Sequence, residues 1–462
     1  MKTTSERRPP NPRSLWGDVD FRRSWVGQSA SQFGERTGQV VLPLIAVLAL
    51  DAGASELGAL RAVEQAPVLL LSLFAGAWVD RRRARDVMMT ADLGRALALA
   101  ALPCAYLLGV LGVPVLITVA LVVGVLSVFF DVAYQASLVR LVRHDQLTQG
   151  TSALEGSRSA AQIGGPALGG ALASLLSAPV AAAAGACCFA LSYLSVRRIR
   201  RREAVPGGAG CGATDTGDHA TGTSIADTAR PTRPRPAQPT LSHIGEGLRF
   251  VLGNATLRAV GLASAAFQFS FAALMTVYLL FLPRELHLSG TAVGLALAAM
   301  GPGAVLGSLL AAWLPRRYGH GLVLVSAAAL ADGALLCVPA LHGSTAVTVA
   351  LLVGVNVLFG TFSQVVNVTV MAVRQAVTPV PLQARVVATI NFAGLGPAPL
   401  GSLLGGRLAD QWGLRTALLV TAAGLALSPL IMGLSPLARL GKSLPGAHSR
   451  TLPPTGQDCC PK

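Results

Sequence analysis

The sequence predicts an all-α polytopic membrane protein with twelve transmembrane helices in two pseudo-symmetric six-helix halves. Of its 462 residues, 52% are hydrophobic and only 13% are charged, whereas soluble domains carry about 25% charged residues. Apolar runs of about 20 residues, the length that crosses a bilayer, recur along the chain. Several glycines, arginines and a proline of the first half also recur in the second half at a constant offset. The composition excludes a soluble globule, a disordered chain, collagen and a secreted disulfide scaffold.

Twelve segments are long and apolar enough to be spans. The expected N-terminal six are 24–49, 56–79, 86–111, 114–138, 150–177 and 179–198. The expected C-terminal six are 255–282, 290–314, 320–341, 344–373, 383–409 and 413–437. The first, fifth and eleventh are less apolar than the others, which is typical of helices that line a wet cavity.

The composition changes between and around the two halves. Residues 199–241 begin with several arginines and then become rich in Gly, Thr and Pro, which predicts a disordered cytoplasmic linker. We therefore expect five regions: an N-terminal tail at 1–23, an N-terminal half at 24–198, the linker at 199–241, a C-terminal half at 242–437 and a C-terminal tail at 438–462.

The distribution of basic residues predicts the orientation. If the N-terminus is cytoplasmic, only Arg284, Arg407 and Arg415 of the basic residues outside the membrane core fall on the other side. This asymmetry follows the positive-inside rule, so we expect both termini in the cytoplasm. Arg outnumbers Lys 34 to 3, which is typical of a GC-rich bacterial coding sequence. The expected location is therefore a bacterial cytoplasmic (plasma) membrane, which the chain crosses several times. The net charge of +15 is then a topology signal rather than a sign of a nucleic-acid partner.

The two halves repeat at one constant offset of 231 residues. The matched positions are Gly76 with Gly307, Arg85 with Arg316, Arg143 with Arg374, Gly165 with Gly396 and Pro166 with Pro397. One register across three separate loops or helices is hard to obtain by chance. Two six-helix halves related in this way are typical of the major facilitator architecture.

The loop between the second and third spans reads Gly76-Ala-Trp-Val-Asp80-Arg81-Arg82-Arg83-Ala-Arg85. It resembles the signature loop of the major facilitator superfamily, Gly-x-x-x-Asp-Arg-x-Gly-Arg-Arg, although Arg83 and Ala84 depart from that pattern. The resemblance implies a gating loop in which Gly76, Asp80, Arg81 and Arg85 form contacts that lock one state. The positive-inside rule alone would also account for the arginines.

The fifth span contains Gly164-Gly165-Pro166-Ala-Leu-Gly169-Gly170. Small residues at this spacing permit close helix packing, and the proline bends the helix. The segment is similar to the antiporter motif of facilitator-superfamily exporters at Gly165, Pro166, Gly169 and Gly170. A general small-residue packing face is the alternative interpretation.

Further segments extend the resemblance over nearly the whole chain except the linker and the tails. They resemble the branch of bacterial drug-efflux and siderophore-export carriers at Asp20-Phe21-Arg22-Arg23, Gly27-Gln28, Leu42-Pro43-Leu44, Arg61-Ala-Val-Glu64, Phe129-Phe130-Asp131 and Arg374-Gln375. The resemblance implies alternating access by rocking of the two halves, and a protein that works as a monomer.

Ionisable residues inside the spans are costly, so they should face one another, a cavity or the interface. Three pairs lie at i,i+3 spacing, which puts both partners on one helix face: Arg61/Glu64, Asp92/Arg95 and Glu155/Arg158. We interpret the last two as a structural ion-pair network near the cytoplasmic side.

The first span carries a polar stripe of Gln28, Gln32, Glu35 and Gln39, spaced 4, 3 and 4 residues apart. Glu35 lies about 16 Å deep at 1.5 Å per residue, near the midplane where this architecture binds substrate and coupling ions. Desolvation disfavours the charged form of a carboxylate, which suits a proton carrier. The proton-coupling candidates are Glu35, Glu64 and Asp131.

Two alternatives for these acids stay open. Glu35 could instead form a salt bridge with an arginine of another helix, such as Arg61 or Arg158. Glu64, the other deep acid, could carry the proton in its place.

The resemblance to the facilitator fold implies which helices line the cavity. On those helices we expect a neutral, polar and aromatic substrate face beside the acids. The candidate cavity residues are Gln28, Gln32, Gln39, Tyr134, Gln135, Gln268, Phe271, Asn356, Gln364 and Asn367. This face suits amphipathic or modestly cationic substrates.

Enzyme signatures are missing from the sequence. It contains no His-Glu-x-x-His, no Walker A loop and no Gly-x-Ser-x-Gly, and its cysteines lack metal-binding spacing. We expect no enzymatic activity, no cofactor and no metal.

The function that these patterns favour is secondary active export, through proton-coupled antiport of a small organic molecule such as an antibiotic, drug or secondary metabolite. The expected partners are that substrate, protons and the lipid bilayer. The alternatives are a siderophore exporter, a nutrient uptake permease and a non-transporting membrane receptor on the same scaffold.

Overall fold

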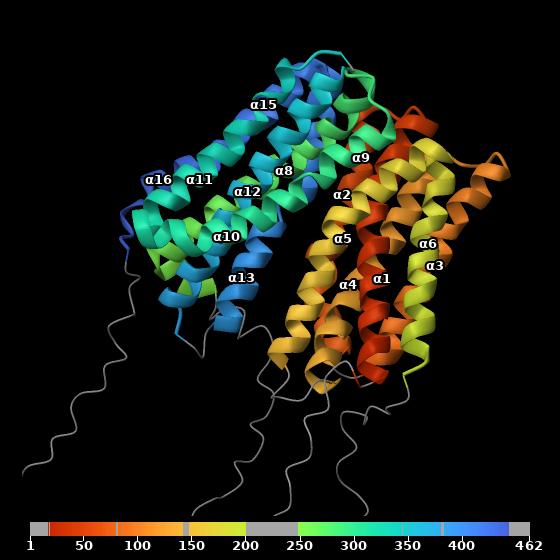
Figure 1. Cartoon of the computed structure of the whole chain (residues 1–462), viewed down its shortest axis with the longest axis horizontal. Coiled ribbons are helices and arrows are strands. Elements are labelled where there is room, and N and C mark those ends of the chain that lie inside the picture. Colours follow the sequence, from red (N-terminus) through yellow and green to blue (C-terminus); the bar gives the residue numbers. More distant parts are fainter. Residues whose placement is uncertain are drawn as a thin grey trace, which may run out of the picture.

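The computed structural model describes residue 17 and residues 19–79, 82–141, 147–199, 248–343, 345–379 and 383–442. Within these ranges all regular elements are helices, and none is a strand. Figure 1 shows them as two helical bundles, with the N-terminal helices in red to yellow and the C-terminal helices in green to blue.

The N-terminal bundle contains six long helices. Their bounds are α1 Val19–Leu44 with the π-helical turn η2 Ile45–Ala49, α2 Ala54–Val79, α3 Ala84–Leu107, α4 Val113–Leu141, α5 Leu147–Leu175 and α6 Ala178–Arg197. Each coincides with one expected span. The first helix starts earlier than expected, since it includes residues 19–23 of the expected N-terminal tail. Arg23 in this added turn donates to the carbonyl of Arg198 at 2.6 Å.

The C-terminal bundle covers the other six expected spans. Its elements are α8 Ala255–Arg284, α9 Gly290–Ala298, α10 Met300–Tyr318, α11 His320–Leu335 with η4 Val338–Ala340, α12 Ala346–Val377, α13 Gln383–Leu395, α14 Ala398–Trp412, α15 Leu414–Leu425, α16 Leu427–Leu434 and η6 Pro436–Arg439.

Three expected spans are each two consecutive helices, and a proline lies close to each break. Proline has no N–H to donate to the carbonyl four residues earlier. Pro302 follows the break at Ala299, Pro429 follows the break at Ala426, and Pro397 stands directly before α14. The spans therefore bend at defined points.

Eight helical stretches in the described ranges are long and apolar enough to cross a membrane: α3, α4, α6, α8, α9 with α10, α11 with η4, α12, and α15 with α16. The other four are α1, α2, α5 and the pair α13 and α14. They include the first, fifth and eleventh expected spans, whose lower apolar content was evident from the sequence.

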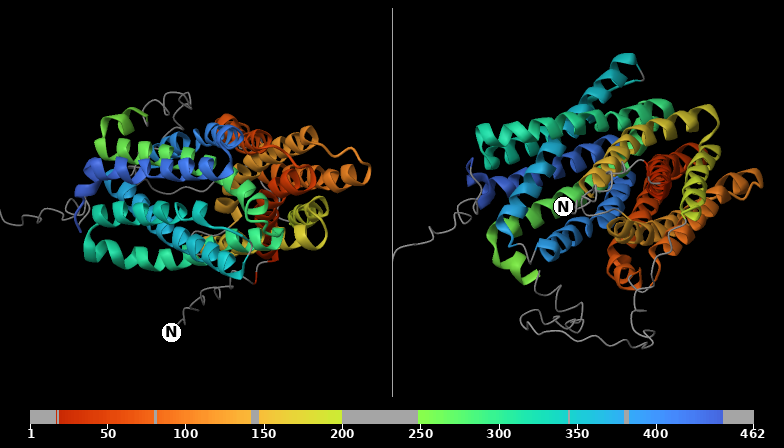
Figure 2. Two further views of the ribbon diagram at one scale, coloured as in Figure 1. Left: turned by 90° about the horizontal axis from the view of Figure 1, so that it is seen from above. Right: turned by 60° about the horizontal axis from the view of Figure 1, so that its bottom comes forward.

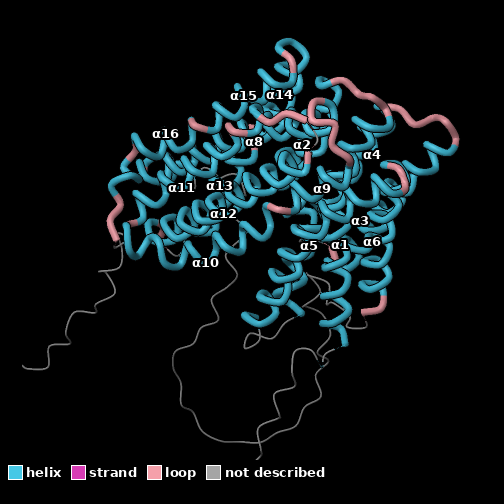
Figure 3. Tube along the Cα trace, turned by 45° about the horizontal axis from the view of Figure 1, so that its top comes forward, coloured by secondary structure: helices cyan, strands magenta, loops and turns pink. Residues whose placement is uncertain are grey.

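The two bundles meet at one end and diverge toward the other (Figures 1 and 2). We call the first the sealed end; it holds the connections at 50–53, 176–177, 285–289 and 413. We call the second the diverging end; it holds 82–83, 199, 319 and 379. Figure 3 shows the helices of both bundles running between these two ends.

Backbones of the two halves approach closely at the sealed end. A methyl group added to Gly58 of α2 would lie 3.2 Å from Gly406 Cα of α14. One added to Gly170 of α5 would lie 2.6 Å from Gly294 Cα of α9. Glycine is needed at these crossings because any side chain would force the two helices apart.

The hydrophobic core explains why the halves stay together there. One buried cluster runs through both bundles near the sealed end and includes Leu42, Leu57 and Phe281. Toward the diverging end each bundle has a core of its own, around Phe130 in the N-terminal half and Leu257 in the C-terminal half. The burial of apolar surface therefore joins the halves at one end only.

Most of the expected linker and of both tails lies outside the described residues. The start of the expected C-terminal tail packs against α11, where Gly321 N donates to Leu440 O at 2.9 Å and His320 N to Gly441 O at 3.1 Å.

Candidate functional site

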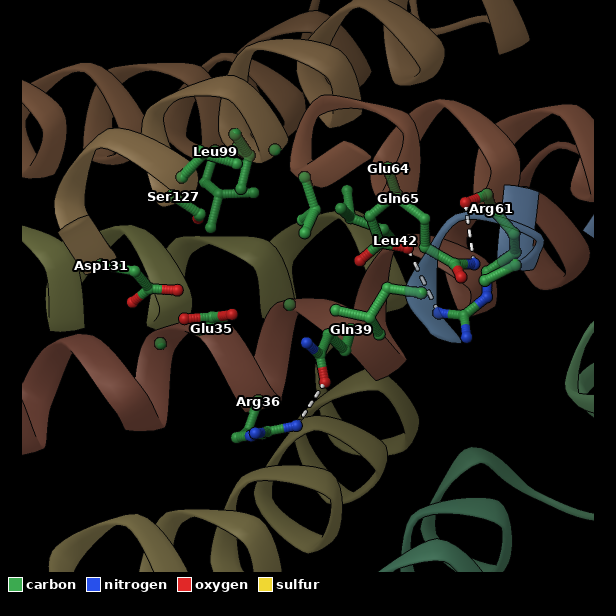
Figure 4. Close-up of a pocket in the computed structure, with 18 of the residues that line it drawn as sticks. Glu35, Arg36, Gln39, Leu42, Arg61, Glu64, Gln65, Leu99, Ser127 and Asp131 are labelled. Atoms are coloured by element: carbon green, nitrogen blue, oxygen red, sulfur yellow. Dashed lines mark hydrogen bonds and ion pairs between the residues drawn. The ribbon is translucent and has the colours of Figure 1, made fainter. Parts of the chain in front are cut away.

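A cavity of about 400 Å³ lies among α1, α2, α3, α4, α6, α8, α13 and α14. Its polar lining comes mainly from the N-terminal half: Glu35, Arg36, Gln39, Arg61, Glu64, Gln65, Ser127 and Asp131. Gln268 of α8 adds an amide from the other half. The three acids that the sequence offered as proton-coupling candidates thus line one cavity (Figure 4).

Glu35 of α1 and Asp131 of α4 face each other across this cavity (Figure 4). Glu35 is half-buried and Asp131 is accessible from the cavity. Among the described residues, neither carboxylate has a hydrogen bond or a salt bridge. Their charges are near enough to interact, and the Arg95, Arg158 and Arg36 charges also act on Asp131. Two unpaired carboxylates therefore share one water-accessible space.

Glu64 lies in the same cavity but has a partner. Arg61, one turn earlier in α2, donates to Glu64 Oε2 at 3.2 Å. This ion pair was predicted from its i,i+3 spacing and is confirmed. The charge of Glu64 also acts on Glu35, so Glu35 interacts with both of the other acids.

The arginines that could have paired with Glu35 are engaged elsewhere or lie apart from it. Arg61 binds Glu64. Arg36, the next residue to Glu35, donates to Gln39 Oε1 at 3.2 Å (Figure 4). Arg158 is exposed and forms no described ion pair with Glu35 or with Glu155. The alternative of a salt-bridged Glu35 is therefore not what the structure contains.

A second charged cluster lies deeper in the N-terminal half. Arg95 donates to Asp92 Oδ1 at 2.5 Å, and both side chains have no solvent exposure. Ser192 donates to Asp92 at 2.6 Å, and Arg95 also donates to Ser31 at 3.0 Å and to Ser127 at 3.2 Å. The predicted Asp92/Arg95 pair is thus confirmed, and it joins α3 to α1, α4 and α6.

Aromatic rings complete this buried cluster. The guanidinium of Arg95 lies 4.3 Å from the ring centroid of Phe130 and 4.3 Å from that of Phe189. A cation between two aromatic faces is stabilised by both rings. Ser127 lines the cavity as well, so the cluster forms the wall behind Asp131.

The other candidate cavity residues of the N-terminal half have varied surroundings. Gln39 lines the cavity, Gln32 is half-buried outside it, and Gln28 is buried with an Oε1 that has no described partner. Tyr134 is half-buried and stacks on Phe130, and its hydroxyl also has no described partner. The side chain of Gln135 lies outside the described residues.

Candidates of the C-terminal half are less concentrated. Gln268 lines the cavity, whereas Phe271 stacks between Phe267 and Phe359 with ring centroids 5.4 Å apart on each side. Gln364 is half-buried and Asn367 is exposed, and neither lines this cavity.

Asn356 is fully buried between helices instead of lining the cavity. It donates to the Tyr278 hydroxyl and to Leu352 O, each at 2.8 Å. The structure therefore gives Asn356 a contact between α8 and α12.

The gating loop is described only in part, since Asp80 and Arg81 lie outside the described residues. Arg85 donates to Arg197 O at 2.7 Å and so caps the end of α6 within its own half. A methyl group on Gly76 would meet no atom within 4 Å. Close packing therefore does not account for glycine at Gly76.

The glycine motif of α5 packs against two different helices. A methyl group on Gly165 would lie 3.2 Å from Thr37 N, and one on Gly169 would lie 3.1 Å from Thr37 O, so both face α1. Gly170 instead faces α9 of the other half, and a methyl group on Gly294 would contact Pro166 O. The motif thus sits where α5 meets both α1 and the sealed end.

Sequence reasoning missed three polar residues at the contact of the halves. Gln65 of α2 donates to Ser402 Oγ of α14 at 3.1 Å beside the cavity. The third residue, Asp410 of α14, contacts the start of α2. A polar residue beside Glu64 in an apolar span was a usable signal for Gln65. No pattern marks Asp410, which lies at the end of a span like many exposed acids.

Comparison with known proteins identifies the family. The model of the Major Facilitator Superfamily matches residues 24–401 and 260–450. The chain belongs to the major facilitator superfamily. It is therefore a multi-pass membrane transporter and not an enzyme, as the sequence predicted. Within the described ranges, no three His, Cys, Asp or Glu side chains gather as metal ligands.

Relatives of known name are similar over most of the chain. The multidrug efflux pump Tap of Mycobacterium tuberculosis is 27% identical over 417 residues, covering 86% of this chain and 89% of that protein. The pump of the same name from Mycolicibacterium fortuitum is 28% identical over 380 residues, covering 79% of this chain and 83% of that protein.

Solved structures share the fold at low sequence identity. A bacterial homologue of the lysosomal transporter Spinster, inward-facing and unoccupied, matches with a TM-score of 0.66 and 13% identity over 93% of this chain and 98% of that one. An inward-facing bacterial homologue of ferroportin gives 0.68 and 15% identity over 89% and 97%. The nucleoside transporter NupG gives 0.69 and 11% identity over 89% and 98%.

Proposed function

We propose that this transporter is a secondary active exporter that exchanges protons for a small organic molecule. The observation that carries the proposal is the acidic cavity: Glu35, Glu64 and Asp131 line one space, and the first and last have no described partner. A carboxylate without a hydrogen-bond or salt-bridge partner is available to bind a proton or a cationic group. Carboxylates inside membrane spans are energetically costly, so three of them around one cavity indicate a functional site.

Charge repulsion supplies a physical basis for exchange. Glu35 and Asp131 are near enough for their negative charges to repel. A proton bound to either one relieves that repulsion, and so does a cationic group placed between them. Once a proton or a cationic substrate has relieved the repulsion, the other gains less free energy by binding. Proton and substrate therefore compete, and competition at one site is what antiport requires.

The direction and the substrate class rest on other support. Relatives at 27–28% identity are named multidrug efflux pumps, and Gly165-Pro166 with Gly169 and Gly170 resembles an antiporter motif. The stacked rings of Phe267, Phe271 and Phe359 lie in the C-terminal half, and Phe267 directly precedes the cavity residue Gln268 in α8. Antibiotics, other drugs or a secondary metabolite with a ring and a positive charge fit this combination.

We place the diverging end, and with it both termini, in the cytoplasm, because the positive-inside rule puts the basic loops there. In this orientation the structure is an inward-facing state of a monomeric carrier in the bacterial cytoplasmic membrane. Green fluorescent protein fused to the C-terminus should then fluoresce in cells, and a dark fusion would indicate the opposite orientation.

Transport by the purified protein in liposomes tests the proposal. The vesicles contain a pH-sensitive dye and carry an imposed pH gradient, and a panel of cationic dyes, macrolides and catecholate siderophores is added in turn. We expect substrate-dependent proton flux in the wild type and its loss in Glu35→Gln. Glu56→Gln is the matched control, because that carboxylate lies outside the cavity and binds Gly53 N.

The outcomes separate the candidates. Flux that survives Glu35→Gln but not Asp131→Asn or Glu64→Gln would move the carrier role to that acid. Flux that survives all three substitutions would contradict the proposal. Catecholate siderophores as the only active compounds would favour the siderophore exporter.

A further inference from the structure

Asp410, at the last turn of α14, reaches across to the other half of the molecule. Its Oδ1 accepts from Ala54 N at 3.2 Å, and its Oδ2 accepts from Ser55 N at 3.1 Å and from the Ser55 hydroxyl. Ala54 and Ser55 are the first two residues of α2. One carboxylate of the C-terminal half therefore caps the first turn of a helix in the N-terminal half.

The first backbone N–H groups of a helix have no partner within it. A carboxylate placed there gains from both the hydrogen bonds and the helix dipole. Such a cap usually comes from the residue just before the helix, but here it comes from a residue more than 350 positions away along the chain. The start of α2 therefore loses this cap whenever α14 moves away.

Other polar contacts across the sealed end are weaker or fewer. Arg284 pairs with Asp51 at 2.7 Å and donates to Ala52 O at 2.8 Å, but the Asp51 side chain is 94% exposed, and exposed pairs contribute little. Thr291 N donates to Ser174 Oγ at 2.7 Å, which is a single neutral bond. Asp410 is exposed as well, but its one carboxylate accepts three bonds, more than any other polar group across the sealed end in the described residues.

The helix that Asp410 caps, α2, also carries Glu64, one of the three cavity acids. Arg61 and Glu64 form their ion pair two to three turns further along α2, and the adjacent Gln65 donates to Ser402 of α14. The helices α2 and α14 are thus joined at the helix start by Asp410 and beside the cavity by Gln65. A movement of α2 relative to α14 must break the Asp410 contacts and disturb the wall that holds Glu64.

We propose that Asp410 is a positioning residue of the transport cycle, which holds the sealed end shut and releases it when the halves part. The inference rests on alternating access, the general mode of the proposed function, and not on proton coupling or on a substrate. Loss of its charge should shift the molecule toward a state in which the sealed end is open, without disturbing either bundle.

Hydrogen–deuterium exchange of the full-length protein in lipid nanodiscs measures this shift without substrate or gradient. The diagnostic segment is the start of α9, residues 290–294, which meets α5 at a separate crossing of the halves. In Asp410→Asn we expect exchange at 290–294 to rise by about tenfold, which corresponds to about 1.4 kcal/mol taken from the closed state. Exchange at residues 54–58 should rise as well.

Glu56→Gln is the matched control. Glu56 also places a carboxylate at the start of α2, accepting from Gly53 N at 2.8 Å, but both groups belong to the same half. It should raise exchange near 53–58 only. The proposal is overturned if Asp410→Asn likewise affects only 54–58, because Asp410 would then be a local cap.

A second variant tests the contact between Asp410 and α2 from the α2 side. Ser55→Ala removes the hydroxyl that binds Asp410 and leaves its carboxylate in place, so exchange at 290–294 should rise by less than in Asp410→Asn. An equal or larger rise in Ser55→Ala would contradict the assignment of the effect to the Asp410 charge. Failure of the antiport proposal would leave both exchange results unchanged.

Discussion

At the scale of single residues, the N-terminal half contains carboxylates in two contrasting environments. Asp92 has no solvent exposure and binds Arg95, Ser192 and Ser31. Glu35 is half-buried, faces a cavity and has no described partner. Asp92, whose carboxylate has several partners, is suited to holding helices together. Glu35, whose carboxylate has none in the described structure, is suited to binding a proton or a substrate reversibly.

Replacement of Asp92 by Asn should therefore destabilise the protein strongly. The substitution leaves the Arg95 charge buried without its counter-ion, and breaking one partner of a buried pair costs about 3–5 kcal/mol. The melting temperature of the purified protein in detergent, followed by tryptophan fluorescence, should fall clearly.

Asp51→Asn is the control for this measurement, because its pair with Arg284 is almost fully exposed on the Asp51 side. It should change stability by less than about 1 kcal/mol. Equal melting temperatures for Asp92→Asn and wild type would show that the buried pair has no structural role.

Helical spacing predicted two of the three ion pairs. Arg61/Glu64 and Asp92/Arg95 form as expected, whereas Glu155 and Arg158 are both exposed and are not paired in the described structure. The i,i+3 spacing puts two side chains on one face but does not set what else is near. Arg158 lies within range of the Asp131 charge, from another helix, and no sequence pattern reports such a contact.

At the scale of elements, α5 shows what close packing demands. Gly165 and Gly169 face α1, and Gly170 faces α9. The glycine spacing predicted a packing face, but it did not say that this face serves two partners in different halves. That division depends on how α5 is rotated within the assembled protein.

Gly170→Ala should weaken the crossing of α5 and α9. The added methyl group would lie 2.6 Å from Gly294 Cα and 2.8 Å from Gly294 N, so two backbones would have to part. Overpacking of this kind costs about 1–3 kcal/mol, and thermal unfolding in detergent should report it.

Gly156→Ala in the same helix is the comparison, since a methyl group there meets no atom within 4 Å. Alanine is the better helix former by about 1 kcal/mol, so this variant should match or exceed wild-type stability. If Gly170→Ala were as stable as Gly156→Ala, the crossing would not depend on the lack of a side chain.

The helices themselves were largely predictable, because length and apolar content select them. The breaks at Ala299 and Ala426 lie three residues before a proline, but Pro67 and Pro166 stand inside the unbroken helices α2 and α5, so a proline alone does not predict a break. Asn356 shows the limit of such reasoning. Its spacing in α12 indicated a polar face, but the structure uses it to bind Tyr278 between helices.

At the scale of the whole molecule, the halves share one core at the sealed end and have separate cores at the diverging end. The repeat at constant offset predicted two related bundles, and the family match agrees with it. In the proposed alternating-access cycle, which end is closed depends on the balance of contacts between two states. A sequence that must support both states carries no simple mark of either one.

At this scale, we propose that a proton and the substrate compete for the acidic cavity between the halves. The most direct measurement is proton release on binding, recorded with a pH indicator in weakly buffered detergent solution after ethidium is added to the purified protein. We expect proton release from the wild type and none from Glu35→Gln at saturating ethidium. Ethidium binding without proton release in the wild type would contradict this competition. So would proton release as large as that of the wild type from all three variants Glu35→Gln, Glu64→Gln and Asp131→Asn.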